Sequence, residues 1–461
     1  MPRSVCRTRA RHGLGGRPVA VAALPVEPAS GLVYEHGWQS WSPTRTYRLG
    51  EPSYRPSGDR SILAAYRPEA SAPAGVYQGQ GLLCVQPSAD APVHIFGVAT
   101  ARDEVPSVRA RLDGGRLLIE ASGEVEERVD QGSGGIDGAL ARWADGFARA
   151  AGVVAVRPAP TVWCSWYHYF TRVSEADIDE NLAFVERLDL PVDVIQIDDG
   201  WQRGVGDWLP PTRFADVPAL VGRIRAAGRR AGLWLAPFLA TSGSDLARAH
   251  PDWLIGDGQG RLVSAGANWE QELFGLDVTH PGVRDYLAEV FSTLRAWGVD
   301  YFKIDFVYAA ALPGRRRDGS SPVTAYRSGL QLIREQIGDA YLLGCGAPLL
   351  PSVGLVDAMR ISPDVDPHWE PAEGDISQPG ARSAVVTGAA RAWQQGRFWI
   401  NDADCLIVRP GVQRREEWAA HVERFGGLRA SSDRLAELDE WGLETTRRLL
   451  SESPSGPFVP S

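Results

Sequence analysis

From residue 161 onward, short apolar segments alternate with amphipathic segments of helical period, and this alternation constrains the fold more than any other feature of the chain. It is typical of parallel strands joined by helical crossovers. The segments with strand composition are residues 162–167, 192–198, 231–237, 274–278, 301–306, 341–346, 358–362 and 398–401. These eight strands predict a (β/α)8 TIM barrel over residues 161–450, with a short crossover between the sixth and seventh strands.

The part of the chain before the barrel has a different pattern. Residues 31–136 contain short strand-like segments separated by turn residues, and residues 108–121 predict a hairpin that turns at Asp113, Gly114 and Gly115. We therefore expect an antiparallel β domain, followed by a helix and linker over residues 137–160. Residues 1–30 predict a disordered or poorly ordered tail rather than a signal peptide, because their apolar stretch is brief and broken by Pro25. Residues 451–461 predict a C-terminal tail, so we expect no large domain after the barrel.

Composition narrows the class of partner. The net charge is -9 and the charged residues are scattered along the 461-residue chain, which predicts no nucleic-acid surface. No segment approaches the roughly 18 apolar residues of a membrane span. The five cysteines lack metal-ligand spacing, and no P-loop or dinucleotide motif follows a strand, so we expect no metal and no cofactor. Reduced thiols and a cytoplasmic location are expected, with a neutral small molecule as substrate.

Lys303 is the only lysine among the 48 basic residues of the chain. It precedes Asp305 by two positions in an apolar predicted strand, so both side chains point to the same face. A compact ammonium fits a tight polar pocket better than a planar guanidinium does. A remnant of compositional bias is the alternative, but the neighbouring aspartate favours a functional role.

Polar and aromatic residues gather at the predicted carboxyl ends of seven strands, where barrels of this kind form their active sites. In strand order they are Trp166, Tyr167 and His168, then Asp198 and Asp199, Trp234, Lys303 and Asp305, Cys345 and Gly346, Arg360 and Asp364, and Asn401 and Asp402. An aspartate after a strand is more often a turn or helix-cap residue than a catalytic one. Agreement among seven strands nevertheless favours a site, and aromatic rings with paired carboxylates are typical of carbohydrate chemistry.

Several long motifs resemble glycoside hydrolase family 36, the melibiase-type α-galactosidases. They are WCSWYHYF at 163–170, QIDD at 196–199, GLWLAPF at 232–238, YFKIDF at 301–306, LGCGAPLLP at 343–351 and MRISPD at 359–364. The stretch WQSW at 38–41 is similar to part of that family's N-terminal β domain. Without the resemblance, Trp41 is either a core aromatic or a sugar platform. The similarity extends over residues 31–450.

The resemblance implies an N-terminal β-sandwich, a catalytic barrel and retaining hydrolysis of terminal α-galactosides of the melibiose and raffinose type. It implies that Asp305 is the nucleophile, helped by Lys303, and that Asp364 is the general acid/base. The galactose pocket would be formed by Trp41, Trp166, Tyr167, Asp198, Asp199, Trp234, Lys303, Cys345, Gly346 and Arg360. Many family members carry Asn two residues after the nucleophile, where this chain has Val307.

Two other functions stay open. A galactosyl transferase of the raffinose-synthase type uses the same two aspartates but passes galactose to a sugar instead of water. A catalytically silent sugar-binding protein would keep the barrel, although the presence of both Asp305 and Asp364 speaks against it. The sequence also leaves open whether the chain forms a homo-oligomer.

Overall fold

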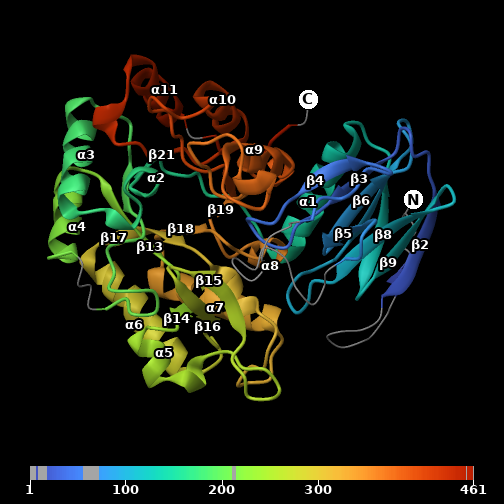
Figure 1. The fold of residues 1–461 in the computed structure, drawn as a ribbon, viewed down its shortest axis with the longest axis horizontal. Coiled ribbons are helices and arrows are strands. Elements are labelled where there is room, and N and C mark those ends of the chain that lie inside the picture. Colours follow the sequence, from blue (N-terminus) through green and yellow to red (C-terminus); the bar gives the residue numbers. More distant parts are fainter. Residues whose placement is uncertain (1–6, 9–17, 56–71, 210–213, 453, 460–461) are drawn as a thin grey trace.

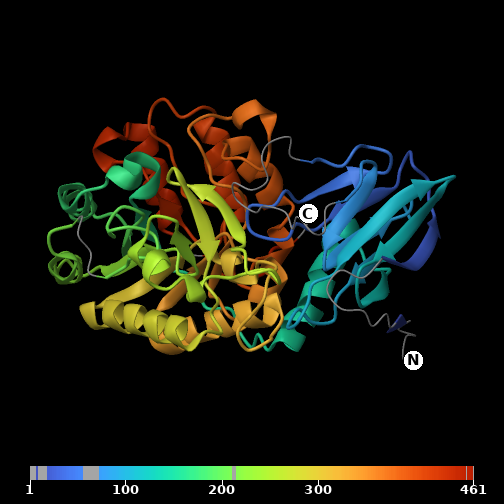
Figure 2. The ribbon, with the colours of Figure 1, turned by 60° about the horizontal axis from the view of Figure 1, so that its bottom comes forward.

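The computed structural model describes residues 7–8, 18–55, 72–209, 214–452 and 454–459. These residues form two parts that lie side by side in Figures 1 and 2. The smaller part consists of antiparallel strands from the N-terminal quarter of the chain, and the larger part is built on a parallel sheet with helices around it. The larger part carries the candidate site.

The N-terminal part contains two antiparallel sheets, with strand orders β1-β10-β7-β6-β3-β4 and β2-β9-β8-β5. Residues alternate between buried and exposed along β9, as expected for a strand with one face on a core. The strands are β1 Arg7–Thr8, β2 Val19–Pro25, β3 Leu32–Glu35, β4 Arg45–Arg48, β5 Val76–Gln80, β6 Leu82–Gln86, β7 Val93–Gly97, β8 Ser107–Asp113, β9 Arg116–Ala121 and β10 Val125–Asp130.

The predicted hairpin is confirmed, and the predicted N-terminal tail is corrected in part. β8 and β9 pair across Gly114 and Gly115, whose φ angles of 53° and 80° suit a two-residue hairpin turn. Residues 19–25, predicted as tail, instead form β2 and pair with β9 at the edge of a sheet. Pro25 is tolerated there because it ends an edge strand. Residues 1–6 and 9–17 of the predicted tail lie outside the described residues.

Helix α1 (Gly135–Ala151) joins the two parts. It packs on β6 and β7 on one side and on η6 (Ala392–Gln394) of the larger part on the other. Its apolar stripe carries Trp143, whose ring lies 5.0 Å from Phe147, 6.0 Å from Trp393 and 6.3 Å from Phe398 (centroid distances). The helix ends at Gly152, which adopts the left-handed conformation common after helix ends. This aromatic cluster fixes the β domain against the larger part.

The larger part has an eight-stranded sheet of order β20-β19-β18-β17-β13-β12-β11-β21, in which every neighbouring pair is parallel. The segment after β20 forms a parallel bridge with β21 between Leu406 and Ser431, which brings the two edge strands together and makes the sheet barrel-like. The strands are β11 Val162–Cys164, β12 Val194–Ile197, β13 Arg230–Leu235, β17 Val299–Ile304, β18 Tyr341–Gly344, β19 Ala358–Arg360, β20 Ile400–Asp402 and β21 Ala430–Ser431.

Helices and short turns connect the strands, and the longer helices cover the outside of this sheet (Figure 1). They are α2 Trp166–Tyr169, α3 Glu175–Arg187, α4 Val217–Ala226, α5 Asp245–Ala249, α6 Pro281–Trp297, α7 Pro322–Ile337, α8 Leu349–Ser352, α9 Ala381–Ala389, α10 Arg415–Phe425 and α11 Glu440–Leu450, with short 3-10 turns η2 Phe170–Arg172, η3 Pro251–Trp253, η4 Val307–Ala311, η5 Ala372–Gly374 and η7 Leu435–Glu437. The short predicted crossover between the sixth and seventh strands is confirmed as α8.

One predicted barrel strand is wrong, and one real strand escaped prediction. Residues 274–278 were expected as the fourth strand, but β16 (Gln271–Gly275) belongs to a separate antiparallel sheet with β14 (Leu239–Thr241) and β15 (Ser264–Asn268). β13 instead pairs directly with β17. The remaining strand of the parallel sheet is β21, whose two residues are too short to give a sequence signal.

Candidate active site

A cavity of about 380 Å³ lies at the carboxyl ends of the parallel strands. Most segments that line it end a strand of the parallel sheet or follow one directly. The others are the loop of Trp41, the turn with Asn268 and Trp269, and the loop with Ser377 and Pro379. The lining residues are Trp41, Trp166, Phe170, Thr171, Asp198, Asp199, Trp234, Asn268, Trp269, Lys303, Asp305, Phe306, Pro363, Asp364, Ser377 and Pro379. Most of the residues singled out in the sequence therefore meet in one cavity. Tyr167, Cys345, Gly346 and Arg360 are buried behind its wall.

Asp305 lies just beyond the end of β17 with both oxygens held. Trp234 Nε1 donates to Oδ2 at 3.1 Å, and the backbone N–H of Phe306 donates to Oδ1 at 2.8 Å. Phe306 has a φ of 52°, the left-handed region that non-glycine residues rarely enter, and this turn directs its N–H back to the carboxylate. The carboxylate thus has a fixed orientation inside the cavity.

Lys303 forms a buried ion pair, but its partner is Asp198. The Nζ atom lies 2.9 Å from Asp198 Oδ2, and the two side chains are 5% and 2% exposed. Burial alone would lower the pKa of Lys303, but the acidic groups around it, Asp198 first and then Cys164 and Asp305, together outweigh burial and hold the pKa well above its ordinary value. Gln196 Nε2 also donates to Asp198 Oδ2, at 2.6 Å. Lys303 and Asp305 both line the cavity, as their shared strand face predicts, but the neighbouring strand β12 leads to the carboxylate that pairs with Lys303.

Asp199 is held by two donors that the sequence did not indicate. Trp269 Nε1 donates to its Oδ2 at 2.9 Å, and Gln202 Nε2 donates to its Oδ1 at 2.5 Å. Trp269 occupies the turn between β15 and β16 together with Glu270, and both have positive φ angles of 49° and 59°. A hairpin turn of this type favours Asn and Gly, so the backbone of this bulky pair is strained, as is common at functional sites.

Asp364 is bonded to Arg360, which lies at the end of β19. Arg360 is 1% exposed and contacts three carboxylates: it donates to Asp364 from Nη1 at 2.9 Å and to Asp402 from Nε at 3.0 Å, and its Nη2 forms an ion pair with Asp404 at 2.7 Å. Burial raises the pKa of Asp364 despite the opposing charge of Arg360. The Asp364 side chain is 32% exposed to the cavity, and a half-buried carboxyl with a raised pKa is suited to carry a proton.

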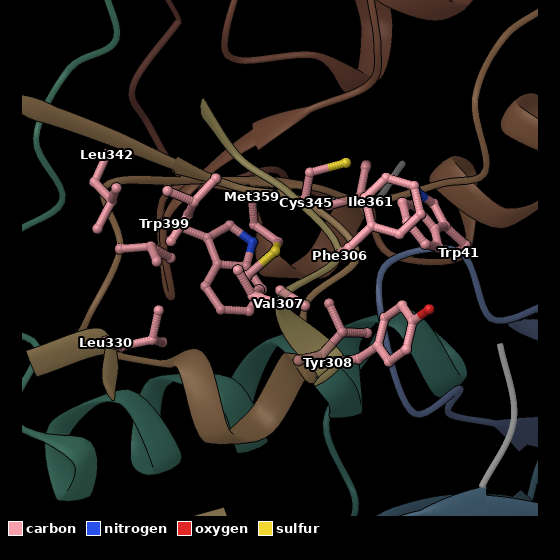
Figure 3. Close-up of a cluster of buried hydrophobic side chains, with 14 of the residues drawn as sticks. Trp41, Phe306, Val307, Tyr308, Leu330, Leu342, Cys345, Met359, Ile361 and Trp399 are labelled. Atoms are coloured by element: carbon pink, nitrogen blue, oxygen red, sulfur yellow. The ribbon is translucent and has the colours of Figure 1, made fainter. Parts of the chain in front are cut away.

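Trp41 enters the cavity from the N-terminal part because residues 38–42 dock onto the loop after β18. Ser40 donates its backbone N–H to Ala347 O at 3.1 Å, and Leu349 donates to Trp38 O at 3.0 Å. The Trp41 ring then packs edge-on against Phe306 at 5.0 Å, as Figure 3 shows. Trp41 Nε1 has no hydrogen-bond partner among the described residues.

Gly346 permits this approach of Trp41. A Cβ atom at Gly346 would lie 2.7 Å from Trp41 Cη2 and 2.9 Å from the backbone nitrogen of Phe306, and its φ is 50°. Any larger residue would push Trp41 out of the cavity. Gly346 therefore shapes the site without lining it, and Cys345 beside it is fully buried in the apolar cluster of Figure 3.

Arg391 secures the same segment from the barrel side. Its buried guanidinium donates to Gln39 O at 3.0 Å, to Ser42 O at 2.7 Å and to Ser40 O, and also to Ile361 O at 2.8 Å. Ile361 follows Arg360 directly, so one side chain links the Trp41 loop to the strand that ends at the Asp364 loop.

Known structures share this fold. The GH36 α-galactosidase AgaA from Geobacillus stearothermophilus aligns with a TM-score of 0.61 at 14% identity, over 93% of this chain and 61% of that chain. The Melibiase family profile matches residues 153–334. An α-galactosidase from Thermus thermophilus aligns with a TM-score of 0.79 at 32% identity, over 98% of this chain and 95% of that chain. This chain belongs to the melibiase-type family GH36.

Curated members of the melibiase-type family match a shorter region. AgaA is 26% identical over 196 residues, which are 37% of this chain and 24% of AgaA. The chain thus spans about a quarter of the length of this curated relative. The Thermus thermophilus enzyme, by contrast, matches nearly throughout, and its structures hold p-nitrophenyl α-D-galactopyranoside or stachyose.

The departure from the melibiase-type pattern at Val307 does not affect the cavity wall. Val307 is fully buried in η4 and lies within the apolar cluster of Figure 3. It is not among the lining residues. Val307 therefore does not contact a hydroxyl group of a ligand in the cavity.

Several lining residues of this melibiase-type site escaped prediction because they lie in loops, in the short turn η2 or at the end of β15. Phe170, Thr171, Asn268, Trp269, Phe306, Pro363, Ser377 and Pro379 carry no periodic signal. The tryptophan within a hairpin turn was the one available hint. Asp404 escaped for a different reason: it lies four residues beyond the start of β20 and reaches the site indirectly, through Arg360 and the backbone of Val365.

The helices and the cysteines bear on membrane association and on the cellular compartment. No helix in the described ranges has the length and apolarity needed to cross a membrane. Cys84, Cys164, Cys345 and Cys405 are buried free thiols, and Cys6 lies outside the described residues. The cytoplasmic location stays a prediction.

Proposed function

We propose that the protein is a retaining α-galactosidase that removes terminal α-linked galactose from melibiose- and raffinose-type oligosaccharides. The catalytic domain would be a (β/α)8 barrel preceded by a β-sandwich. The observation that carries this proposal is the presence of Asp305 and Asp364 in one cavity, the first held by two N–H donors and the second with a raised pKa. Double displacement requires such a pair, one carboxylate and one carboxylic acid.

Asp305 would attack the anomeric carbon while Asp364 donates its proton to the glycosidic oxygen. The bond to the leaving sugar breaks, and a galactosyl ester of Asp305 forms. Asp364, now ionised, would take a proton from water as that water attacks the ester, which releases galactose and restores both groups. Two inversions give net retention of the α configuration.

The remaining lining residues would bind the sugar. Asp198 and Asp199 would accept hydrogen bonds from galactose hydroxyls, and Lys303 would donate to one. Trp41 would cover a sugar face. The complexes of the related Thermus thermophilus enzyme with an aryl α-galactoside and with stachyose support this substrate class.

Four predicted site residues would act from behind the wall. Arg360 would hold Asp364, and Tyr167 would act through the network described below. Gly346 would admit Trp41, and Cys345 would pack beneath the pocket. In this proposal none of the four needs to touch galactose directly.

Turnover of p-nitrophenyl α-galactoside by wild-type protein and by Asp305→Asn tests the proposal. Wild type should release p-nitrophenol, whereas Asp305→Asn should stay folded but lose activity by at least about a thousandfold, because no ester can form. Asp339→Asn, an exposed site with a side chain 92% accessible, is the matched control and should keep full activity. Binding without turnover by wild type would indicate a silent sugar-binding protein. Galactose transfer that requires an added acceptor sugar would indicate a transferase.

A further inference from the structure

Asp404 is a completely buried carboxylate, and each of its two oxygens has two polar partners. Its Oδ1 accepts from the backbone N–H of Cys405 at 2.7 Å and forms an ion pair with Arg360 Nη2 at 2.7 Å. Its Oδ2 accepts from the backbone N–H of Val365 at 2.8 Å and from the hydroxyl of Tyr167. Three hydrogen-bond donors and one ion-pair partner occupy both oxygens, as suits an ionised carboxylate.

Two of these contacts lead directly to Asp364. Val365 follows Asp364 in the chain, so the bond from its N–H to Asp404 fixes the backbone that carries the Asp364 side chain. Arg360 bonds Asp404 with Nη2 and Asp364 with Nη1, so Asp404 also fixes the guanidinium that orients the Asp364 carboxyl. Asp404 has a φ of 89°, a conformation that costs energy in a non-glycine residue and is typical of functional sites.

We propose that Asp404, oriented by Tyr167, is a positioning residue that keeps Asp364 in place and protonated for its role as general acid. This inference rests on the proposed function of Asp364. Asp404 does not line the cavity and has no contact with a substrate there. It acts through Arg360 and through the backbone of Val365.

The charges around Arg360 explain why Asp364 can keep its proton beside a guanidinium. If Arg360 faced Asp364 alone, its charge would strongly stabilise the ionised form of Asp364, which cannot donate a proton. Asp402 and Asp404 pair with the other two nitrogens of Arg360, and their negative charges offset its positive charge. Lys303 also favours ionisation of Asp364, whereas burial and the charges of Asp305 and Asp198 disfavour it.

The groups that face Asp404 itself are Arg360, Asp364, Asp402, Tyr167 and Cys405. The pKa of Asp404 is raised to about 6 overall: burial is the largest cause, Asp364 and Asp402 also raise it, and Arg360 and the Tyr167 hydroxyl oppose them. The pKa of Tyr167 is itself raised by burial and by these carboxylates, so its hydroxyl keeps the proton that it donates. Near neutral pH, Asp404 is therefore ionised.

The sign of the expected pH effects follows. Asp404→Asn removes a negative charge beside Arg360, so the pKa of Asp364 should fall and the alkaline limb of kcat/KM should move to lower pH, by about one unit. Tyr167→Phe keeps that charge but removes a donor, so the pKa of Asp404 should rise and the acid limb should move to higher pH. A merely structural role would lower activity without moving either limb.

Leaving-group dependence supplies a second readout. Asp404→Asn should lower kcat on raffinose by about tenfold more than kcat on p-nitrophenyl α-galactoside, which needs little protonation. Asp357→Asn is the matched control: Asp357 adjoins the opposite end of β19, pairs with Arg334 at 2.9 Å and accepts from Leu342 N–H at 2.8 Å, yet lies far from Asp364 along the strand. It should leave both readouts at wild-type values.

Asp364→Ala separates failure of this inference from failure of the proposed function. An equal loss on both substrates in Asp364→Ala would overturn the general-acid role itself. If Asp364→Ala discriminates between the substrates but Asp404→Asn has wild-type pH limbs and wild-type discrimination, the positioning role is refuted while the function stands. If Asp404→Asn does not fold, Tyr167→Phe decides: an upward shift of the acid limb supports the inference, and an unmoved limb overturns it.

Discussion

Replacing Lys303 by Arg tests whether the single lysine of the chain is required by the shape of the pocket. The ammonium lies 2.9 Å from Asp198 in a pair whose side chains are 5% and 2% exposed. Arginine keeps the positive charge but places it on a longer, planar group, which must extend into the cavity to remain near Asp198. There it would occupy space that the proposed galactose requires.

The expected loss of activity in Lys303→Arg follows from the hydrogen bond that Lys303 would make to a substrate hydroxyl. One charge-assisted hydrogen bond to a substrate hydroxyl is worth about 1.5–3 kcal/mol. A loss near 2.7 kcal/mol corresponds to about a hundredfold lower kcat/KM. Stability should change little, because Asp198 keeps a cationic neighbour and the Gln196 donor at 2.6 Å. Lys303→Met, in contrast, leaves Asp198 buried without its ion pair and should cost about 3–5 kcal/mol in the free energy of unfolding.

The assay compares kcat/KM on one α-galactoside and the melting temperature of each variant. Lys303→Arg should lose activity alone, and Lys303→Met should lose both activity and stability. Arg223→Lys, an exchange in the exposed pair with Asp179 at 3.0 Å, is the control and should lose neither. A Lys303→Arg enzyme within a few-fold of wild type would show that the lysine is a compositional remnant and that the pocket tolerates a guanidinium.

Two further predictions concern the stereochemistry and the contact between the two parts. The first-formed galactose should be the α-anomer by proton NMR, because a covalent intermediate needs the carboxyls of Asp305 and Asp364 only about 5–5.5 Å apart; a β-anomer formed first would contradict double displacement. Arg391→Lys should raise KM several-fold and lower the free energy of unfolding by about 2–3 kcal/mol, because lysine cannot satisfy all the buried carbonyls of residues 39, 40, 42 and 361 that Arg391 binds. A KM equal to that of wild type would show that the Trp41 loop holds its place without Arg391.

The barrel-like sheet was predictable because its strands are buried on both faces. Such strands are continuous apolar runs, and those of β12, β13 and β17 stand out from the amphipathic helices between them. The same reasoning failed for β16. Its apolar residues belong to an inserted antiparallel sheet, but their spacing in the sequence resembles that of a short barrel strand. Periodicity reports that a segment is buried, not which sheet buries it.

The sequence by itself determined which groups would stand at the strand ends. Lys303, Asp305, Asp198 and Trp234 lie in or directly after strands whose direction is set by the parallel fold, so their meeting in one cavity follows from position along the chain. The tertiary structure alone decided the partners: Lys303 with Asp198 instead of Asp305, and Asp404 with Arg360. Pairing depends on the register between strands and on loop conformations such as the positive φ of Asp404, and long-range packing fixes both.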